Sequence, residues 1–471
     1  MAKKFYLTTT LPYVNADPHL GFAMEIVRAD VLARYHRLLG EEIIFNTGTD
    51  EHGQKVYQKA IEQKQTPQDY CGSHAQKYQA LKKLLNLSFT HFIRTTQKDH
   101  VEAAQEFWRR CQKKGDIYKD HYQIKYCVGC ELEKTDSELI NNRCPVHPDK
   151  EIEIRDEENY FFRFSKYQKA LLELYERHPR FVVPQFRFEE IKKFVANGLK
   201  DFSISRLKAK MPWGVEVPND PEQVMYVWFD ALINYISTLG WPKKGSDYET
   251  FWPGIQLAGK DNLRQQSAMW QAMLISAGLP NSKQIYVEGF ITSEGQKMSK
   301  STGNVIDPFE LVKKYGVDPV RYYLLREIPA YDDGNFSDRR FCELYTADLA
   351  NGLGNLVSRV AKLAENSAEN FAPATANFYP EIKNYLDAFA FDQALILINQ
   401  KTNHLDSLIN QTKPWELTGT KLKAVLTPLV TEIRQLAFNL QPFLPTTTEK
   451  IASQFAGPKI SSASPLFPRL N

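Results

Sequence analysis

Residues 4–46 read KFYLTTTLPYVNADPHLGFAMEIVRADVLARYHRLLGEEIIFN, and this stretch predicts a β-α-β unit. Its first part, 4–10, is rich in β-branched and aromatic residues, which favours a strand. Pro and Gly residues then mark a long turn. Apolar residues recur at near-helical spacing over 23–39 until Gly40 ends the helix, and 43–46 is a short buried strand. Strands that alternate with helices are typical of a parallel sheet covered by helices.

The rest of the 471-residue chain changes character several times. The α/β pattern stops, returns after an insertion, and gives way to almost continuous helical text in which 340–366, 385–409 and 421–440 have the length of bundle helices. We predict a Rossmann-like parallel sheet split by an insertion and followed by an all-α bundle. The expected parts are 1–114, the first half of the α/β domain; 115–221, the insertion; 222–294, the second half; 295–338, a loop and linker domain; and 339–471, the bundle.

Composition excludes several classes of protein. Apolar residues make up 43% and charged residues 24%, a globular balance that excludes a disordered or fibrous chain. The net charge of +3 excludes a strongly basic nucleic-acid coat, although a local basic surface remains compatible with it. No run of roughly eighteen apolar residues predicts a membrane span. The N-terminal residues lack the apolar core of a signal peptide, so we expect a cytoplasmic protein.

A metal site is predicted inside the insertion. Cys127 and Cys130 form one pair, and Cys144 and His147 form a second pair after thirteen intervening residues. Two such pairs can face each other tetrahedrally, and a closed shell of three cysteines and one histidine suits structural zinc. Unrelated cysteines beside a surface histidine are the poorer explanation, because both pairs have knuckle spacing. We expect one structural zinc ion per chain.

Two loops carry the signals for nucleotide chemistry. In the turn PHLGF, His19 can donate to phosphate oxygens and Gly21 lets backbone approach a ligand closely. The segment KMSKS, 297–301, lies between two glycines, so Lys297 and Lys300 can close over a triphosphate. Taken alone, the first is explained by a turn histidine and the second by a solvated loop. Together, almost 280 residues apart, they favour nucleotide binding.

These two motifs resemble the signatures of the class I aminoacyl-tRNA synthetases. Over essentially its full length the chain is similar to the methionyl-tRNA synthetase family of that class. The resemblance is carried by TLPYVNADPHLG near the start, TGTDEHG at 47–53, YVWFDALINY at 226–235, AGKD at 258–261, KMSKSTGN at 297–304 and KPWEL at 413–417. It implies a ligase that makes methionyl-adenylate from methionine and ATP and transfers the methionyl group to the 3′-terminal ribose of tRNA(Met), initiator included.

The resemblance also implies the site residues. His19, Lys297 and Lys300 would be catalytic. ATP would be bound, with Mg²⁺ on its phosphates, by His19, Gly21, Gly259, Asp261, Lys297, Ser299 and Lys300. Methionine would lie against Leu11, Tyr13, Asp50, Trp228, Ala231, Leu232, Tyr235 and Gln266, with Asp50 facing its ammonium group. Trp228 and Tyr235 are seven residues apart and share a face if 227–236 is one helix. Without the resemblance, a core aromatic pair and a turn aspartate explain these residues.

The chain departs from the family pattern at two positions. Phe22 stands where the first signature usually ends in a second histidine. Gln266 stands where many relatives carry a histidine in the methionine pocket, and Gln265 replaces the aromatic residue before it. An amide can still bond a neighbouring tyrosine or the substrate.

The helical third would read the anticodon. Asn355 and Arg359 are spaced i, i+4 and project from one helix face, and Trp415 follows Pro414 in a loop. Arg and Asn can read a base edge, and a free base can stack on tryptophan. Unaided, the pattern also fits a solvated helix face and a loop tryptophan over a core; the resemblance assigns all three to anticodon binding. Since no dimer-forming extension follows residue 471, we expect a monomer.

Two other functions are compatible with part of the sequence. A catalytically impaired tRNA-binding relative of the class I synthetases would be consistent with Phe22 and Gln266, but both signature lysines, His19 and Asp50 are kept. A leucine, isoleucine or valine enzyme would need a large editing insertion. The insertion here, about 105 residues and partly zinc knuckle, is too short for that domain.

Overall fold

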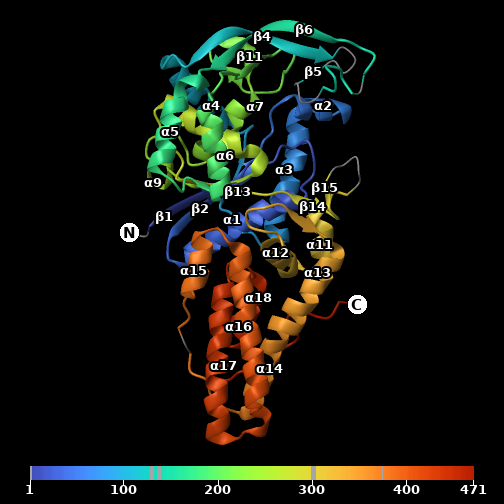
Figure 1. Ribbon diagram of the computed structural model, residues 1–471, viewed down its shortest axis with the longest axis vertical. Coiled ribbons are helices and arrows are strands. Elements are labelled where there is room, and N and C mark those ends of the chain that lie inside the picture. The colour runs from blue at the N-terminus through green and yellow to red at the C-terminus, as the bar shows by residue number, and fades with distance from the viewer. Residues whose placement is uncertain are drawn as a thin grey trace.

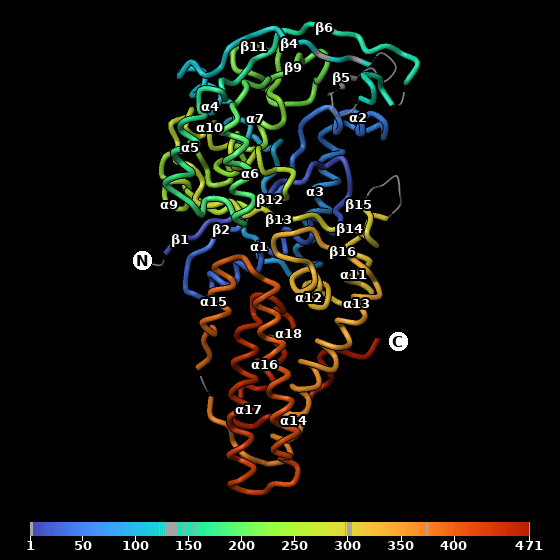
Figure 2. Tube along the Cα trace, in the orientation of Figure 1, coloured from blue at the N-terminus to red at the C-terminus, as the bar shows by residue number. Residues whose placement is uncertain are grey.

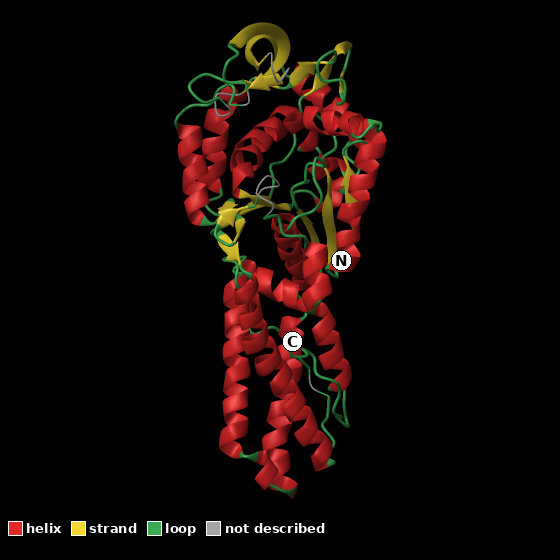
Figure 3. Ribbon diagram, turned by 90° about the vertical axis from the view of Figure 1, so that its right-hand side faces the viewer, coloured by secondary structure: helices red, strands yellow, loops and turns green. Residues whose placement is uncertain are grey.

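The computed structural model describes residues 3–127, 132–134, 139–145, 147–298, 304–373 and 375–470. An α/β body lies at one end of the long axis and a helical bundle at the other, as the two perpendicular ribbon views show (Figures 1 and 3). Within the described ranges, no helix combines the length and the apolar character that a membrane span requires.

A six-stranded parallel sheet forms the centre of the body. Its order is β3 (His91–Arg94), β2 (Glu42–Thr49), β1 (Lys4–Thr8), β12 (Ile255–Gly259), β13 (Gln284–Glu288) and β7 (Val182–Val183). The chain builds outward from β1 through β2 to β3 in one direction and from β12 to β13 in the other, where β7, from an earlier part of the chain, forms the edge. The two central strands therefore flank the point where the strand order reverses, and ligands of open α/β sheets bind beyond the carboxyl ends of such strands.

The predicted β-α-β unit is confirmed. After β1, helix α1 (Leu20–Leu38) begins at its N-cap His19 and packs on the sheet with most of its length buried. Three charged side chains, Glu25, Arg28 and Asp30, are buried along α1, so this helix also brings charged groups into the interior. The other helices and turns of this body are α2 (Gln54–Glu62), α3 (Pro67–Leu84), α4 (Lys98–Lys113), α7 (Val227–Ala231), α8 (Asn234–Ser237), α9 (Tyr248–Phe251), the 3₁₀ turn Lys260–Asn262, the π turn Gln265–Met269 and α10 (Trp270–Ala277).

The insertion is built on a long antiparallel hairpin. Strands β4 (Ile117–Cys127) and β6 (Ile152–Phe162) pair along their whole length, and β5 (Leu132–Lys134) and β8 (Phe202–Ser203) extend this sheet. A second small sheet contains β9 (Ser205–Leu207), β10 (Glu216–Val217) and β11 (Asp220–Met225).

The middle of the predicted insertion packs on the α/β body itself. The short 3₁₀ turn Phe164–Tyr167 and helices α5 (Gln168–Arg177) and α6 (Gln185–Ala196) bury apolar side chains in the same core as α10. Between these helices, β7 pairs in parallel with β13 and becomes the edge strand of the main sheet. Strand β13 is therefore the second strand from this edge of the sheet.

The remaining elements connect the body to the bundle and form it. The linker contains β14 (Ile291–Ser293), β15 (Gln296–Lys297), β16 (Gly334–Phe336), α11 (Pro308–Tyr315) and α12 (Val317–Arg326). The bundle contains α13 (Asp338–Leu344), a π-helical segment Tyr345–Gly354, α14 (Asn355–Ser367), α15 (Pro380–Asp387), α16 (Phe391–Thr412), a 3₁₀ turn Pro414–Glu416, α17 (Gly419–Leu440) and α18 (Pro445–Gln454). Helices α14, α16 and α17 run side by side, as the Cα trace shows (Figure 2). The predicted segments 340–366 and 421–440 are thus confirmed as helical. The segment 385–409 is interrupted, since α15 ends at Asp387 and α16 begins at Phe391.

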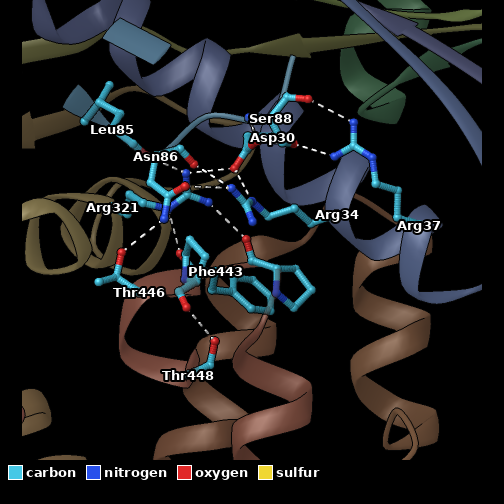
Figure 4. A network of polar contacts seen from close by, with 12 residues as sticks. Asp30, Arg34, Arg37, Leu85, Asn86, Ser88, Arg321, Phe443, Thr446 and Thr448 are labelled. Carbon is cyan, nitrogen blue, oxygen red and sulfur yellow. Dashed lines mark hydrogen bonds and ion pairs between the residues drawn. The ribbon is translucent and has the colours of Figure 1, made fainter. Parts of the chain in front are cut away.

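A buried ion pair ties the bundle to α1. Asp30 of α1 lies 2.8 Å from Arg321 of α12, and both side chains are fully buried. The same guanidinium donates to the carbonyl oxygens of Leu85, Pro442 and Phe443, at 3.1, 3.0 and 2.8 Å (Figure 4). One charged side chain therefore joins the α/β body, the linker and the turn between α17 and α18.

Candidate active site

One large cleft opens at the carboxyl ends of the central strands. It has a volume of about 2210 Å³ and lies where the strand order of the sheet reverses. The predicted methionine-site residues that line it are Leu11, Tyr13, Asp50, Trp228, Ala231, Leu232, Tyr235 and Gln266, and the predicted ATP-site residues are His19, Gly21, Gly259 and Asp261. Segments more than 200 residues apart in the chain thus meet in one place.

His19 stands at the N-terminus of α1. Its Nδ1 accepts a hydrogen bond of 3.1 Å from the backbone N–H of Gly21. A neutral imidazole that accepts at Nδ1 carries its proton on Nε2, which can donate to a phosphate oxygen. Gly21 leaves room for this arrangement, because a Cβ there would lie 3.1 Å from two atoms of the His19 ring and would require the ring to shift slightly. The helix N-terminus adds partial positive charge for an anion.

Phe22 follows in this turn and is buried. Its ring packs edge-on against Tyr78 of α3, with centroids 5.3 Å apart. The position at which the family signature carries a second histidine is therefore part of the apolar wall beside the cleft.

Asp50 presents an unpaired carboxylate oxygen in the cleft. Its side chain is 8% exposed, and no described residue offers a hydrogen bond to Oδ1. Burial raises the pKa of Asp50 well above its ordinary value, and the neighbouring Asp230 and Glu51 raise it further. A cation, such as the ammonium group of an amino acid, would supply the missing partner and favour the ionised form.

Tyr13 lies next to Asp50, held by backbone. The two residues form an isolated parallel bridge, with Val14 N–H donating to the Asp50 carbonyl oxygen at 3.1 Å. Gly53 makes room for the tyrosine ring, because a Cβ there would lie 2.6 Å from the Tyr13 hydroxyl, and its φ of 112° suits glycine.

The aromatic pair Trp228 and Tyr235 lines the same cleft, although the helix between them is broken. Helix α7 ends at Ala231 and α8 begins at Asn234, so the single helix over 227–236 does not form. Asn234, the first residue of α8, donates across the break to the Ala231 carbonyl oxygen at 2.7 Å. The two rings reach one cleft through two short helices rather than one continuous helix face.

Gln266 comes from the π turn at 265–269 and is 1% exposed. Its Nε2 donates to the Tyr235 hydroxyl at 2.6 Å. A π turn inserts one extra residue into a helix and redirects the side chains around it, and such turns are frequent at functional sites. The amide therefore bonds the neighbouring tyrosine, as the sequence suggested it could.

The second nucleotide loop reaches the cleft through Met298, which lines it. The backbone of Lys297 pairs in β15 with Thr292 of β14. The Lys297 side chain, Ser299 and Lys300 lie outside the part of the chain that the structure describes, so their assignment stays a prediction.

Two groups of buried charges beside the cleft were not predicted. Glu25 accepts hydrogen bonds from the backbone and hydroxyl of Thr10 at 2.6 and 2.7 Å, and Arg28 pairs with Glu288 at 3.0 Å. Burial raises the pKa of both glutamates, and Glu288 raises that of Glu25 further. Nothing in the spacing of these residues marks them, because they meet only through the β1–β12–β13 arrangement.

The second group is a histidine pair on Asp230. His52 Nδ1 lies 2.6 Å from one carboxylate oxygen and His100 Nε2 lies 2.8 Å from the other. Burial alone would raise the pKa of Asp230, but the two histidines lower it below its ordinary value. His52 and Asp230 belong to the family motifs TGTDEHG and YVWFDALINY. The motifs therefore contained these two residues, but the sequence analysis predicted no role for either of them.

Three of the four predicted metal ligands gather in the insertion. The ligand atoms of Cys127, Cys144 and His147 all lie within 4.8 Å of one another, and Cys127 Sγ is 3.9 Å from His147 Nδ1. Cys130 lies outside the described residues. Two thiols and an imidazole at this separation fit a zinc ion.

The predicted RNA-binding residues lie on the bundle. Asn355 begins α14 and is exposed, while Arg359 of the same helix pairs with Asp406 and donates to Asn410 Oδ1 at 2.7 Å. Trp415 is 55% exposed in the turn between α16 and α17. The turn comes directly before α17, and the far end of this 22-residue helix lies beside Arg321, next to the α/β body. The turn therefore lies at the end of the bundle away from the cleft.

Comparisons with known proteins agree with this geometry. The family model described as "tRNA synthetases class I (M)" matches residues 5–148 and 130–361. The methionine–tRNA ligase of Nostoc sp. is 40% identical over 477 residues, covering 96% of this chain and 90% of that protein. The ligase of Thermosynechococcus vestitus is 42% identical over 483 residues, with the same coverage of both chains. A solved structure of Mycobacterium tuberculosis methionyl-tRNA synthetase in complex with methionyl-adenylate superposes with a TM-score of 0.90 at 35% identity, covering 99% of this chain and 100% of that one.

Proposed function

The chain belongs to the methionyl-tRNA synthetases of class I, and from that membership we propose that it is an active methionine–tRNA ligase. It activates L-methionine with ATP and transfers the methionyl group to the 3′-terminal ribose of tRNA(Met), initiator tRNA included. The single observation that supports this best is the meeting of Asp50, the aromatic residues Tyr13, Trp228 and Tyr235, and His19 in one cleft.

Methionine fits the apolar side of that cleft. Its ammonium group would bond Asp50 Oδ1, the buried oxygen that no described residue satisfies. Its flexible and polarizable thioether would lie against aromatic walls, which is a favourable contact for sulfur. Leu11, Ala231 and Leu232 complete the apolar lining.

ATP occupies the side of the cleft at the N-terminus of α1. In the reaction a carboxylate oxygen of methionine attacks the α-phosphorus, a C–O–P anhydride forms, and the bond to the bridging oxygen breaks to release pyrophosphate. His19 donates from Nε2 to phosphate oxygens, and the N-terminus of α1 adds favourable dipole charge. We assign Lys297, Ser299 and Lys300 to the leaving pyrophosphate and Gly259 and Asp261 to the ribose. Mg²⁺ enters with ATP and neutralises part of its charge.

Outside the cleft, the proposal assigns two further roles. Cys127, Cys144 and His147, with Cys130 as the fourth ligand, would hold one zinc ion that stabilises the end of the β4–β6 hairpin. Asn355, Arg359 and Trp415 would bind the anticodon, for which the exposed tryptophan offers a stacking surface. The monomeric state and the cytoplasmic location stay predictions from the sequence.

Amino-acid-dependent exchange of pyrophosphate into ATP, measured with each of the twenty amino acids, tests the proposal. Exchange with methionine alone would support it and would show that Phe22 and Gln266 are compatible with catalysis. Absence of exchange with every amino acid, for folded protein that still binds tRNA, would favour the catalytically impaired relative.

A further inference from the structure

Asp230 is a fully buried carboxylate on α7, a helix that also carries residues lining the cleft. We propose that Asp230, kept ionised by hydrogen bonds from His52 and His100, acts with Asp50 as a second negative charge for the ammonium group of the bound amino acid. Asp230 and the two histidines are positioning residues, because none of the three is among the residues that line the cleft. The inference rests on the proposed function, since it assumes that the cleft binds an amino acid.

Both carboxylate oxygens of Asp230 are bonded by imidazole nitrogens. His52 Nδ1 lies 2.6 Å from Oδ2, and His100 Nε2 lies 2.8 Å from Oδ1. An ionised carboxylate only accepts, so both nitrogens carry protons and donate. The other nitrogen of His100 lies 2.9 Å from Ser237 Oγ, whose hydroxyl can donate to it. The His100 ring therefore satisfies both contacts in its neutral form, and with two neutral rings the group carries one negative charge.

The two donors make the ionised form of Asp230 the stable one in spite of its burial. Burial raises the pKa of this carboxyl, but His52 and His100 lower it below its ordinary value. Hydrogen bonds donated to a carboxylate favour its charged form. If one donor is removed, a buried charged oxygen is left without a partner, and the carboxyl avoids that state by taking up a proton.

Asp50 has two buried carboxylates as neighbours, and their counter-charges differ. Glu51 pairs with the guanidinium of Arg94 at 2.7 and 3.0 Å, so a permanent cation balances its charge. The ion-pair partners of Asp230 within the described part of the chain are the two imidazoles. Burial raises the pKa of Asp50 most, and Asp230 raises it more than Glu51 does. The same negative charge that disfavours an ionised Asp50 in the empty cleft attracts a bound ammonium group.

Other ionisable side chains next to Asp50 are neutral. Tyr13 pairs with Asp50 through the backbone, and Cys71 of α3 donates from Sγ to the Glu51 carbonyl oxygen at 3.4 Å. Burial raises the pKa of both the Tyr13 hydroxyl and the Cys71 thiol, so neither carries charge near neutral pH. The charge available to the ammonium group therefore comes from Asp50 and Asp230.

Removal of the Asp230 charge should affect methionine binding in two distinguishable ways. Above the pKa of Asp50, the Kd should rise because one attracting charge is lost. Asp50 should also ionise more easily, so the loss of affinity on acidification, the acid limb of the binding curve, should begin at a lower pH. A change that only loosened α7 would raise the Kd by the same factor at every pH.

Calorimetric titration with L-methionine between about pH 5 and 9, a range that includes imidazole titration, measures both effects. Asp230→Asn should raise the Kd about threefold to tenfold above the pKa of Asp50 and move the acid limb about half a pH unit to one unit lower. His52→Leu and His100→Leu each remove a donor, so each should move the acid limb in the same direction. His52→Asn and His100→Gln keep an N–H donor without a titrating ring, so both should keep the wild-type acid limb.

His36→Leu is the matched control. His36 Nδ1 lies 2.7 Å from Glu41 Oε2, in the last turn of α1, and neither residue of this histidine–carboxylate pair lines the cleft. This substitution should change neither the methionine Kd nor the acid limb. Circular dichroism identifies which variants are folded.

The inference is overturned if folded Asp230→Asn keeps the wild-type acid limb. Loss of the acid limb in His52→Asn and His100→Gln also overturns it, because the imidazoles would then be the titrating groups. If Asp230→Asn does not fold, the comparison of His52→Leu with His52→Asn decides, and equal acid limbs in the two overturn the inference. Failure of the proposed function looks different, since the wild-type protein would then neither bind methionine nor exchange pyrophosphate with it.

Discussion

Tyr13 and Asp50 pair across a single parallel bridge, which places an aromatic ring beside a buried carboxylate with one unpaired oxygen. The bridge joins the turn after β1 to the end of β2, the two segments that enter the cleft next to each other. The carboxylate is thus held by backbone in a position where ionisation is unfavourable until a cation binds.

Asp50→Asn should weaken methionine binding and stabilise the ligand-free protein. Loss of a charge-assisted bond to the ammonium group is expected to raise the methionine Kd roughly tenfold to a hundredfold. The folded-state pKa of Asp50 is raised, so the ligand-free protein loses stability as pH rises from about 4 through that pKa, and the amide removes this loss. We expect about 1 kcal/mol of added stability at pH 8, measured by denaturant unfolding.

Asp17→Asn is the matched control for that change. Asp17 also lines the cleft, but its side chain is 59% exposed and pairs with Lys77 at 2.7 Å. Asp17→Asn should change neither the methionine Kd nor the free energy of unfolding appreciably. Equal effects of the two substitutions would contradict a specific role for Asp50.

Lys300→Ala should collapse adenylate formation and leave tRNA binding nearly intact. A lysine that stabilises the leaving pyrophosphate acts mainly in the transition state, so we expect kcat for exchange to fall roughly a hundredfold to a thousandfold. Lys313 of α11, with an 80% exposed side chain, provides a control, and Lys313→Ala should leave exchange unchanged. A parallel loss of exchange and tRNA affinity in Lys300→Ala would count against the assigned role.

Cys127→Ser combined with Cys130→Ser should remove one equivalent of zinc, as elemental analysis would show. The end of the β4–β6 hairpin should then become sensitive to proteolysis, because a structural ion contributes directly to folding of a small region. Cys342→Ser controls for the loss of a thiol, since Cys342 contacts Tyr315 far from the cluster in sequence. Unchanged zinc content in the double variant would exclude the site.

Trp415→Ala should lower aminoacylation of tRNA roughly tenfold to a hundredfold and leave pyrophosphate exchange within twofold of wild type. The reason is that base stacking on an exposed aromatic ring is worth about 1–3 kcal/mol, whereas the cleft is lined by residues of the α/β body. That body lies at the opposite end of the long axis from the turn between α16 and α17 (Figure 1). Phe186 of α6 is also an exposed aromatic, 45% exposed, and Phe186→Ala should change neither assay. Matching losses in both assays would contradict an anticodon role for Trp415.

The sequence predicted His19 from the turn after its first strand, whereas Asp50 was assigned to the site only through the family resemblance. Both residues follow strands of the parallel sheet, and parallel strands end at a common edge, which explains why the two residues meet. Gln256 and Gln271 could not be predicted as partners of Gln266, because their bonds depend on a π turn and on the packing of α10 against the sheet. The two-residue edge strand β7 was missed because so short a segment carries no periodic signal.

Arg321→Met should destabilise the protein by about 3–5 kcal/mol at pH 7, because it leaves the buried Asp30 without its buried partner. Burial alone would raise the pKa of Asp30, but Arg321, Arg34 and hydrogen bonds from Ser88 lower it below its ordinary value. A carboxylate with a lowered folded-state pKa stabilises the protein above its unfolded pKa of about 4 and loses that contribution as pH falls. The difference between Arg321→Met and wild type should therefore be largest near neutral pH and shrink as the pH falls below about 4.

Unfolding midpoints in urea across that pH range measure the effect, and Arg34→Met is the matched control. Arg34 bonds the same carboxylate at 2.8 Å, but its side chain is 21% exposed, so water can replace it more readily. Arg34→Met should lower the free energy of unfolding by less than half as much as Arg321→Met does. The reason is that removal of the Arg321 guanidinium also leaves three buried carbonyl oxygens without their donor. A difference for Arg321→Met that stays constant with pH would show that packing of the long side chain, rather than its charge on Asp30, joins the bundle to the α/β body.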